Sequence, residues 1–148
     1  MADRPTYVLD ASVAGKWHLL DEEHTGLATT VLADYRRGLI DFVAPAHMPY
    51  EVASAIRKAQ VQRRLEADRA ADLIRLVQRW GIPLAEPDFA AAYQWSMSIS
   101  CSFYDGLYLA MAEAEGVPIL TADRRLVRAM GTRFPHYVWI GDYRSPIN

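Results

Sequence analysis

Four acidic residues of this sequence occupy positions where α/β proteins keep reactive groups. Asp10 and Asp123 each follow a short apolar run with strand character, and Glu51 and Asp105 each fall in the first turn of an expected helix. In a parallel sheet, the carboxyl ends of the strands and the starts of the following helices lie at the same edge. We therefore expect the four side chains to converge at one edge of a sheet.

Carboxylates that converge need something to relieve their repulsion. Two carboxylates ~4 Å apart repel by roughly 4 kcal/mol at an effective dielectric constant of 20. Such a cluster holds protons or binds a cation, and an all-oxygen cluster suits Mg²⁺ or Mn²⁺ rather than zinc. Mg²⁺ keeps several waters, which it can polarise for attack on a phosphodiester. The pattern thus favours metal-dependent hydrolysis.

Taken singly, most of these acids have an ordinary structural explanation. Ser102 and Asp105 have the spacing of a helix capping box, and Asp123 suits the cap of the helix after it. Asp10 has no such duty, because Ser12 is expected to cap the first helix. The prediction of a reactive site therefore depends on the four acids together.

The elements that would position these acids alternate along the chain. Short apolar runs predict strands over residues 7–9, 39–44, 82–84, 117–120 and 137–140. Apolar residues at helical spacing, with capping residues around them, predict helices over residues 12–20, 21–38, 49–64, 65–80, 88–97, 102–116 and 123–130. Strands that alternate with helices predict a parallel sheet covered on both faces.

Composition limits the class of protein. The chain has 148 residues, of which 51% are hydrophobic, as expected for one domain with a substantial core. No apolar run approaches the ~20 residues of a membrane span, so we expect no membrane segment. A single cysteine, Cys101, cannot form an internal disulfide, which favours the reducing cytoplasm. The formal charge of −2 provides no overall attraction to nucleic acid, so local patches would have to supply it.

Four motifs resemble those of a known family. The sequence is similar to PIN-domain nucleases at Val8–Ser12, Pro49–Val52, Tyr104–Ala110 and Leu120–Leu126. The likeness runs from residue 7 to residue 140. Length and motif spacing are most similar to the VapC-type toxins of toxin–antitoxin pairs.

This resemblance implies a fold and a function. It implies one three-layer α/β/α PIN-like domain over residues 1–148, with a core at about 7–140 and a mainly parallel sheet of four to five strands. The implied activity is that of a Mg²⁺- or Mn²⁺-dependent endoribonuclease. Such proteins are commonly homodimeric and are silenced by a cognate antitoxin whose C-terminal segment blocks the site. Gly106 stands where alanine is more usual, and we expect it only to weaken the helix start slightly.

The resemblance also assigns residue roles. It implies that the catalytic acids are Asp10, Glu51, Asp105 and Asp123. Of these, Asp10, Asp105 and Asp123 would bind the metal, with the first two as the foremost direct ligands. Ser12 and Thr121 would support the site.

Three cations near these motifs could hold RNA phosphates. Arg124 and Arg125 directly follow Asp123, and Lys16 lies one helical turn after the first motif. A solvated helix face explains the two arginines equally well.

A Mg²⁺-binding phosphoacceptor module of the receiver type is the alternative from another functional class. Receiver domains also gather acids at the ends of parallel strands, but they need paired acids after the first strand and a lysine late in the chain. Here Asp10 has no acidic neighbour, Glu51 falls in a helix and no lysine follows Lys58. These features favour the nuclease, whose acids are intact, over both the receiver and an inactive relative.

Overall fold

A five-stranded parallel sheet organises the chain in the computed structural model, which describes residues 3–147. The strands are β1 (Thr6–Leu9), β2 (Asp41–Pro45), β3 (Leu84–Ala85), β4 (Ile119–Thr121) and β5 (Tyr137–Trp139). They lie in the order β3-β2-β1-β4-β5, and every neighbouring pair is parallel. The prediction of a mainly parallel sheet of four to five strands is confirmed.

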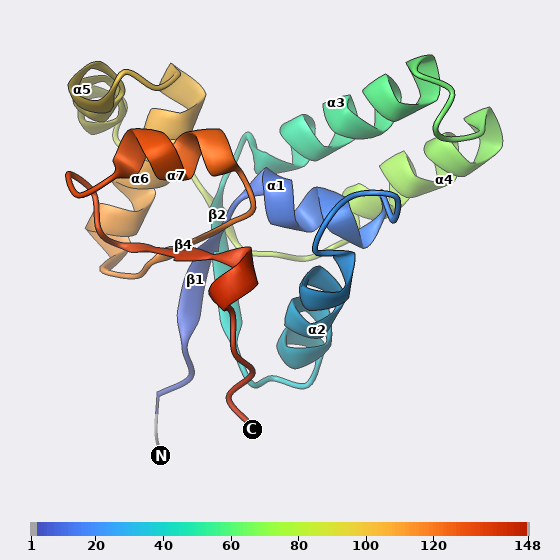
Figure 1. Cartoon of the computed structure of the whole chain (residues 1–148), viewed down its shortest axis with the longest axis horizontal. Helices are drawn as coiled ribbons and strands as arrows, with labels where there is room; N and C mark the ends of the chain where they lie inside the picture. Colours follow the sequence, from blue (N-terminus) through green and yellow to red (C-terminus); the bar gives the residue numbers. More distant parts are fainter. Residues whose placement is uncertain (1–2, 148) are drawn as a thin grey trace.

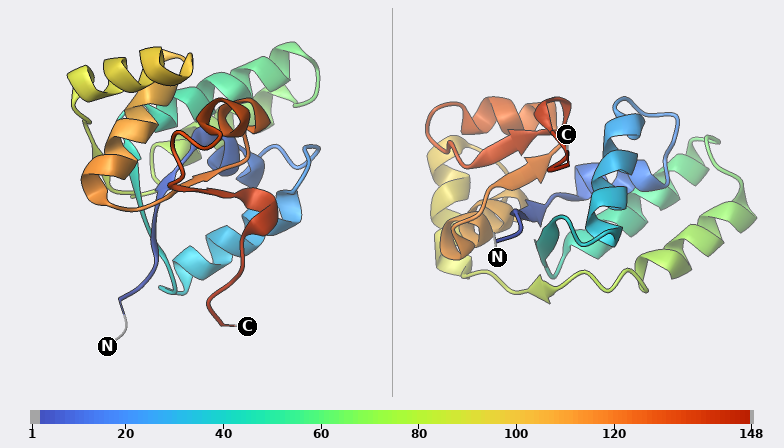
Figure 2. Two further views of the ribbon diagram at one scale, coloured as in Figure 1. Left: turned by 60° about the vertical axis from the view of Figure 1, so that its left-hand side comes forward. Right: turned by 90° about the horizontal axis from the view of Figure 1, so that it is seen from below.

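Helices cover both faces of this sheet. The described residues form α1 (Ala11–Ala14), α2 (Thr25–Arg36), α3 (Met48–Val61), α4 (Ala67–Val77), α5 (Phe89–Ile99), α6 (Phe103–Glu115) and α7 (Arg124–Met130), with 3-10 turns η1 (Gly15–Trp17) and η2 (Ile140–Asp142). In Figure 1 and in the right panel of Figure 2, helices α1–α4 lie on one side of the sheet and α5 and α6 on the other. This is the expected three-layer α/β/α arrangement. No described helix is long and apolar enough to cross a membrane.

The strand order creates a natural place for a site. From β1 the chain moves outward to β2 and β3, and it then returns to place β4 on the other side of β1. Leu9 pairs with Leu120 in register, so the residues after β1 and those ending β4 are neighbours. Ligands in open α/β sheets bind at this kind of switch point, outside the carboxyl ends of the strands.

Helix α6 is held in the interior, as its sequence predicts. Residues 106–112 are all buried, because both sides of the helix are apolar. The Ser102 hydroxyl accepts a hydrogen bond from the Asp105 N–H at 3.0 Å at the start of the helix. Gly116, in the left-handed conformation at φ 66°, ends it. The helix therefore presents its first turn rigidly at the sheet edge.

Two expected helix boundaries near the N-terminus were wrong. Helix α1 starts directly after Asp10, so Ser12 lies inside the helix instead of capping it, and the helical segment ends at Trp17 instead of continuing to residue 20. Helix α2 begins at Thr25 rather than at Asp21. Asp21 instead accepts two hydrogen bonds from Arg64, which lies three residues after the end of α3, from Nε to Oδ2 at 2.8 Å and from Nη2 to Oδ1 at 2.9 Å. The acids at residues 21–23 favour a helix start, but a long-range ion pair holds this stretch as a loop.

Candidate active site

Asp10 is the most buried of the four acids. It follows β1, is 6% exposed and lies beside the end of β4. Its Oδ2 atom accepts hydrogen bonds from the Ser12 hydroxyl at 2.6 Å and from the Thr121 hydroxyl at 2.7 Å. The two residues expected to support the site thus both hold one oxygen of this carboxylate, which leaves its Oδ1 for another partner.

The surroundings of Asp10 disfavour its charge. Its pKa is raised to about 7, chiefly by burial and to a smaller extent by the nearby charges of Glu51 and Asp105, against the lowering effect of the Ser12 and Thr121 hydrogen bonds. An acid whose pKa is raised by other acids must lie within reach of their charges. The chain therefore brings Asp10, Glu51 and Asp105 to one region.

Glu51 reaches this region from the first turn of α3. Its Oε1 accepts a hydrogen bond of 2.8 Å from the hydroxyl of Tyr108, and this hydroxyl accepts one of 3.3 Å from the backbone N–H of Ala11. The His47 Nε2 atom lies 2.9 Å from the same oxygen, at ion-pair distance but without the alignment of a hydrogen bond. One oxygen of Glu51 is thus held while its side chain remains partly exposed.

Asp105 lies in the first turn of α6. Burial raises its pKa, and the charges of Asp123 and Glu51 raise it further, while the Ser102 hydrogen bond and the charge of Arg125 lower it. Asp105 and Arg125 both line a small hollow of about 90 Å³. This pairing places one positive group beside the acids.

Asp123 combines the two roles considered for it. Its Oδ1 accepts hydrogen bonds from the N–H groups of Arg125 at 2.9 Å and Leu126 at 3.2 Å, so it caps α7. Its own N–H donates to the Thr121 hydroxyl at 3.0 Å, the hydroxyl that also donates to Asp10. Capping therefore fixes the carboxylate close to the other acids.

The chemistry of the four acids suits a hard cation, but few of them can bind one ion directly. All four groups are carboxylates, the oxygen donors that Mg²⁺ and Mn²⁺ prefer. Within residues 3–147, no three His, Cys, Asp or Glu side chains gather closely enough to hold one ion together. Mg²⁺ is commonly held by one or two carboxylates plus waters. The donor set therefore fits an ion whose coordination is completed by water.

The three cationic side chains predicted to contact RNA phosphates differ in their surroundings. Lys16 is 7% exposed and lies 3.3 Å from Glu22. Arg124 is exposed, lies 3.2 Å from Glu23 and covers the ring of Trp139 at 5.0 Å. Arg125 is the one that lines the hollow beside Asp105. Of the three, only Arg125 has surroundings that favour the predicted phosphate contact over a structural role.

Sequence reasoning missed the polar role of Tyr108. In the sequence this residue reads as part of the apolar side of a buried helix. Its position one turn after Asp105 is the signal that could have revealed it, because residues three apart on a helix are neighbours.

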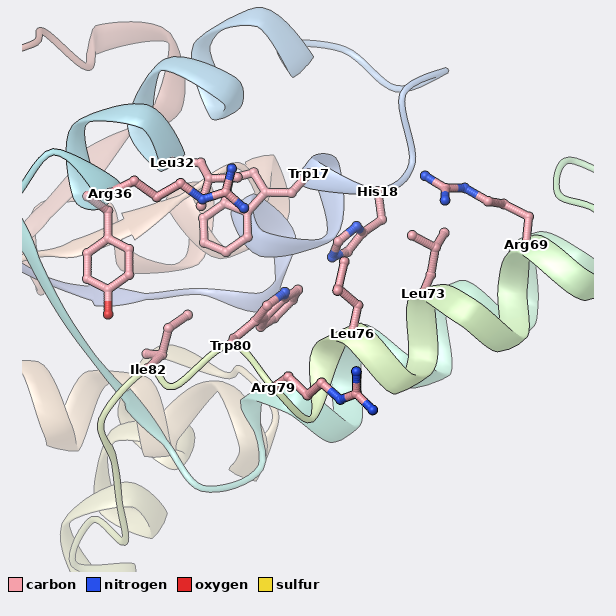
Figure 3. A pocket seen from close by; sticks show the side chains of 11 residues that line it. Trp17, His18, Leu32, Arg36, Arg69, Leu73, Leu76, Arg79, Trp80 and Ile82 are labelled. Carbon is pink, nitrogen blue, oxygen red and sulfur yellow. The ribbon is translucent and has the colours of Figure 1, made fainter.

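A larger hollow lies away from the acids. It measures about 430 Å³ between α2, η1 and α4, and Figure 3 shows its aromatic and basic walls. The residues that line it are Trp17, His18, Leu32, Tyr35, Arg36, Arg69, Leu73, Leu76, Arg79, Trp80 and Ile82. None of the four acids is among them.

Known proteins match most of the chain. A family model described as the PIN domain matches residues 7–131. Ribonuclease VapC12 of Mycobacterium tuberculosis is 39% identical over 94 residues, which cover 60% of this chain and 68% of that protein. Ribonuclease VapC1 of the same species is 34% identical over 89 residues, covering 60% and 67%. The crystal structure of PAE2754 from Pyrobaculum aerophilum shares the fold, with a TM-score of 0.62 at 20% identity over 93% of this chain and 90% of that one.

Proposed function

Because the chain belongs to the PIN-domain family and, within it, to the VapC-type ribonucleases, we propose that it is an endoribonuclease dependent on Mg²⁺ or Mn²⁺. We further propose that it is the toxin of a type II toxin–antitoxin pair. The observation that supports the nuclease is the position of Asp10 at the switch point of the sheet, where burial and the charges of Glu51 and Asp105 raise its pKa to about 7. The receiver-type alternative has no comparable support.

In phosphodiester hydrolysis the residues of the acid site would have different roles. A bound Mg²⁺ would polarise a water for attack and neutralise charge on the phosphate oxygens. Asp10 would hold the ion through Oδ1, because Ser12 and Thr121 already occupy Oδ2. Asp105 and Asp123 would complete the acidic wall from the starts of α6 and α7, and Arg125 would orient the substrate phosphate. Glu51 would hold a water at the acid site through Oε2, the oxygen that Tyr108 does not bond.

RNA cleavage with defined metals tests the nuclease. Purified protein should cut a mixed RNA in Mg²⁺ or Mn²⁺ and lose this activity in EDTA. Asp10→Asn and Asp105→Asn variants, purified in the same way, should fold normally and lose cleavage by about 10²-fold or more. These variants also control for contaminating ribonucleases. Cleavage that persists in EDTA, or in both variants, would contradict the proposal.

Growth of a bacterial host tests the toxin role. Induced expression of the chain should arrest growth, and expression of Asp105→Asn to the same level should not. Co-expression of the cognate antitoxin, encoded by another gene, should restore growth. A host that grows normally with active nuclease present would refute the toxin role while leaving the nuclease intact.

The hollow of Figure 3 is the surface that we assign to a part of the antitoxin other than the C-terminal segment expected to block the acid site. Trp17 and Trp80 form an aromatic wall, with ring centroids 5.3 Å apart, and Arg36, Arg69 and Arg79 surround it. Within the described residues none of these three arginines makes an ion pair. An acidic segment that carries a bulky apolar side chain complements this surface. Trp80→Ala should therefore weaken antitoxin binding, measured by calorimetry, without reducing RNA cleavage.

A homodimer is the assembly that we propose for the chain. On α5 the large apolar side chains Phe89, Tyr93 and Met97 recur every fourth residue and are 63%, 58% and 66% exposed. We call these three residues the α5 stripe. Residues 89–99 include no charged side chain, so two copies can meet along this helix without burying a charge.

A further inference from the structure

We propose that Tyr108 is a positioning residue that locks Glu51 to the end of β1, and that the acid site depends on this bond for its affinity for a divalent cation. This inference rests on the proposed function for its activity readout, whereas its binding readout stands independently. It goes beyond the acids themselves, because Tyr108 is not among the residues expected to bind the cation or the RNA.

The hydroxyl of Tyr108 joins two elements at once. It donates to Glu51 Oε1 at 2.8 Å and accepts from the N–H of Ala11 at 3.3 Å. The side chain is completely buried, so water does not compete for either bond. A phenol has one proton to donate and lone pairs to accept with, and both functions are in use. Helix α6 therefore connects the residue after Asp10 to the acid on α3.

This connection removes freedom from the acid that would otherwise have the most. The Glu51 side chain is 38% exposed and has three rotatable bonds. His47 Nε2 lies 2.9 Å from Oε1 but is not aligned for a hydrogen bond, so the hydrogen bond from Tyr108 is the contact that limits the orientations of the side chain. The bond to Tyr108 fixes Oε1 and thereby directs Oε2. Glu51 would act on the cation through the water that Oε2 holds. Residues that orient the groups around a metal through such bonds commonly change metal affinity or activity by about 10–100-fold when they are replaced.

The second bond explains why the residue must be a tyrosine. Ala11 is the first residue of α1, and the N–H groups of a first helical turn have no partner within the helix. Tyr108 supplies one, next to Asp10. A phenylalanine would fill the same space but would leave this N–H unsatisfied and Glu51 free. The phenol ring therefore contributes to packing, while the hydroxyl positions Glu51 and satisfies the N–H of Ala11.

A second buried tyrosine provides a matched control. Tyr143 is 2% exposed, and its hydroxyl donates to Asp34 Oδ2 at 2.7 Å, a bond of the same kind and of similar length. It ties the residue after η2 to α2, and neither residue belongs to the acid site. Replacing either tyrosine by phenylalanine removes one hydroxyl bonded to a carboxylate. Only Tyr108→Phe removes it from the acid site.

The experiment compares these two variants of the full chain. Mn²⁺ binding is measured by the loss of the free-ion electron paramagnetic resonance signal, together with melting temperature, kcat and KM for RNA. Both variants should lose a similar few degrees of melting temperature. Tyr108→Phe alone should weaken Mn²⁺ binding by about 10-fold and lower kcat by a similar factor with an unchanged KM. A Tyr108→Phe variant that binds Mn²⁺ and turns over like Tyr143→Phe would overturn the inference.

A third variant tests whether Tyr108 acts through Glu51. Glu51→Gln keeps an oxygen for the Tyr108 bond but removes the charge at a partly exposed position, so it should fold even if Tyr108→Phe does not. The Tyr108→Phe change should weaken Mn²⁺ binding less in this background than in the wild type. If Glu51→Gln binds Mn²⁺ as tightly as the wild type, Glu51 has no part in binding and the inference is wrong. A wild-type protein that binds Mn²⁺ but cuts no RNA would instead contradict the proposed function, and the Mn²⁺ comparison would still decide the role of Tyr108.

Discussion

The charged form of Asp10 carries an energetic cost in the folded protein, which a bound proton or a cation relieves. In the metal-free protein its pKa rises from 3.8 to about 7, chiefly because the carboxylate is buried. The folded protein therefore keeps a proton that the unfolded chain loses above pH 3.8. This group's contribution to the free energy of unfolding falls as pH rises from about 4 to about 7 and is flat above that range. A shift of about three pKa units corresponds to roughly 4 kcal/mol.

Asp10→Asn should consequently stabilise the metal-free protein at alkaline pH. Asparagine cannot ionise, and its oxygen can still accept the Ser12 and Thr121 hydrogen bonds. We expect the variant to exceed the wild type by up to about 4 kcal/mol at pH 8, with a difference that narrows toward pH 5. Urea denaturation in EDTA at pH 5, 6.5 and 8 measures this. A variant less stable than the wild type at pH 8 would mean that Asp10 ionises there at little cost.

Substitutions of Arg125 and of Lys16 should have different effects on RNA binding. Arg125 lines the hollow at Asp105, whereas Lys16 is buried against Glu22. Arg125→Ala should reduce the slope of log affinity against log salt concentration by about one, as expected for one lost phosphate contact. Lys16→Met should lower the melting temperature and leave that slope unchanged. Fluorescence anisotropy of a labelled RNA in EDTA provides the slopes, and a changed slope for Lys16→Met would restore it as an RNA contact.

At the scale of the elements, Gly106 has a role that the sequence did not reveal. The expectation that it merely weakens the helix start was incomplete. A Cβ atom at this position would lie 2.2 Å from the carbonyl oxygen of Ala92, so α6 packs directly on the backbone of α5. Such a contact depends on which helix packs against α6, and the local sequence around residue 106 does not predict the packing partner.

Gly106→Ala should therefore destabilise the protein despite alanine's higher helix propensity. The backbone of α5 must move to make room, at a cost of about 1–3 kcal/mol. Gly26→Ala is the matched control, because Gly26 also lies in a helix and a Cβ there meets nothing within 4 Å. It should be neutral or stabilising by up to about 1 kcal/mol. Equal denaturation midpoints for the two variants would show that α5 and α6 are not in such close contact.

Element boundaries were predictable where local signals agree with the tertiary structure. Ser102 and Gly116 bound α6 as predicted, because a cap and a left-handed glycine act within their own turn. The start of α2 was not predictable, because a partner 43 residues away holds Asp21 in a loop. The role of Ser12 was mispredicted for a similar reason: its hydroxyl donates to Asp10 and accepts from the N–H of Ala122, which directly follows the neighbouring strand β4.

At the scale of the whole molecule, the arrangement of the acids follows from alternation and strand order. Alternating strands and helices predict that strand ends and helix starts share an edge, and Asp10 and Asp123 lie there as expected. The sequence could not show that Thr121 would bridge these two residues, because the bridge depends on the Leu9–Leu120 register. The shared edge of Asp10 and Asp123 was thus predictable, and the hydrogen bonds that join them through Thr121 were not.

The same scale includes the surface through which two copies would meet. The α5 stripe consists of Phe89, Tyr93 and Met97, whereas Leu20, another exposed apolar residue, lies in the loop between η1 and α2. Tyr93→Glu places a charge in the middle of the stripe, and a dimer that buries it would lose several kcal/mol. We expect sedimentation equilibrium to show a dimer for the wild type and a monomer for Tyr93→Glu. Leu20→Glu adds the same charge outside the stripe and should remain dimeric, whereas a dimeric Tyr93→Glu would place the interface on another face of the molecule.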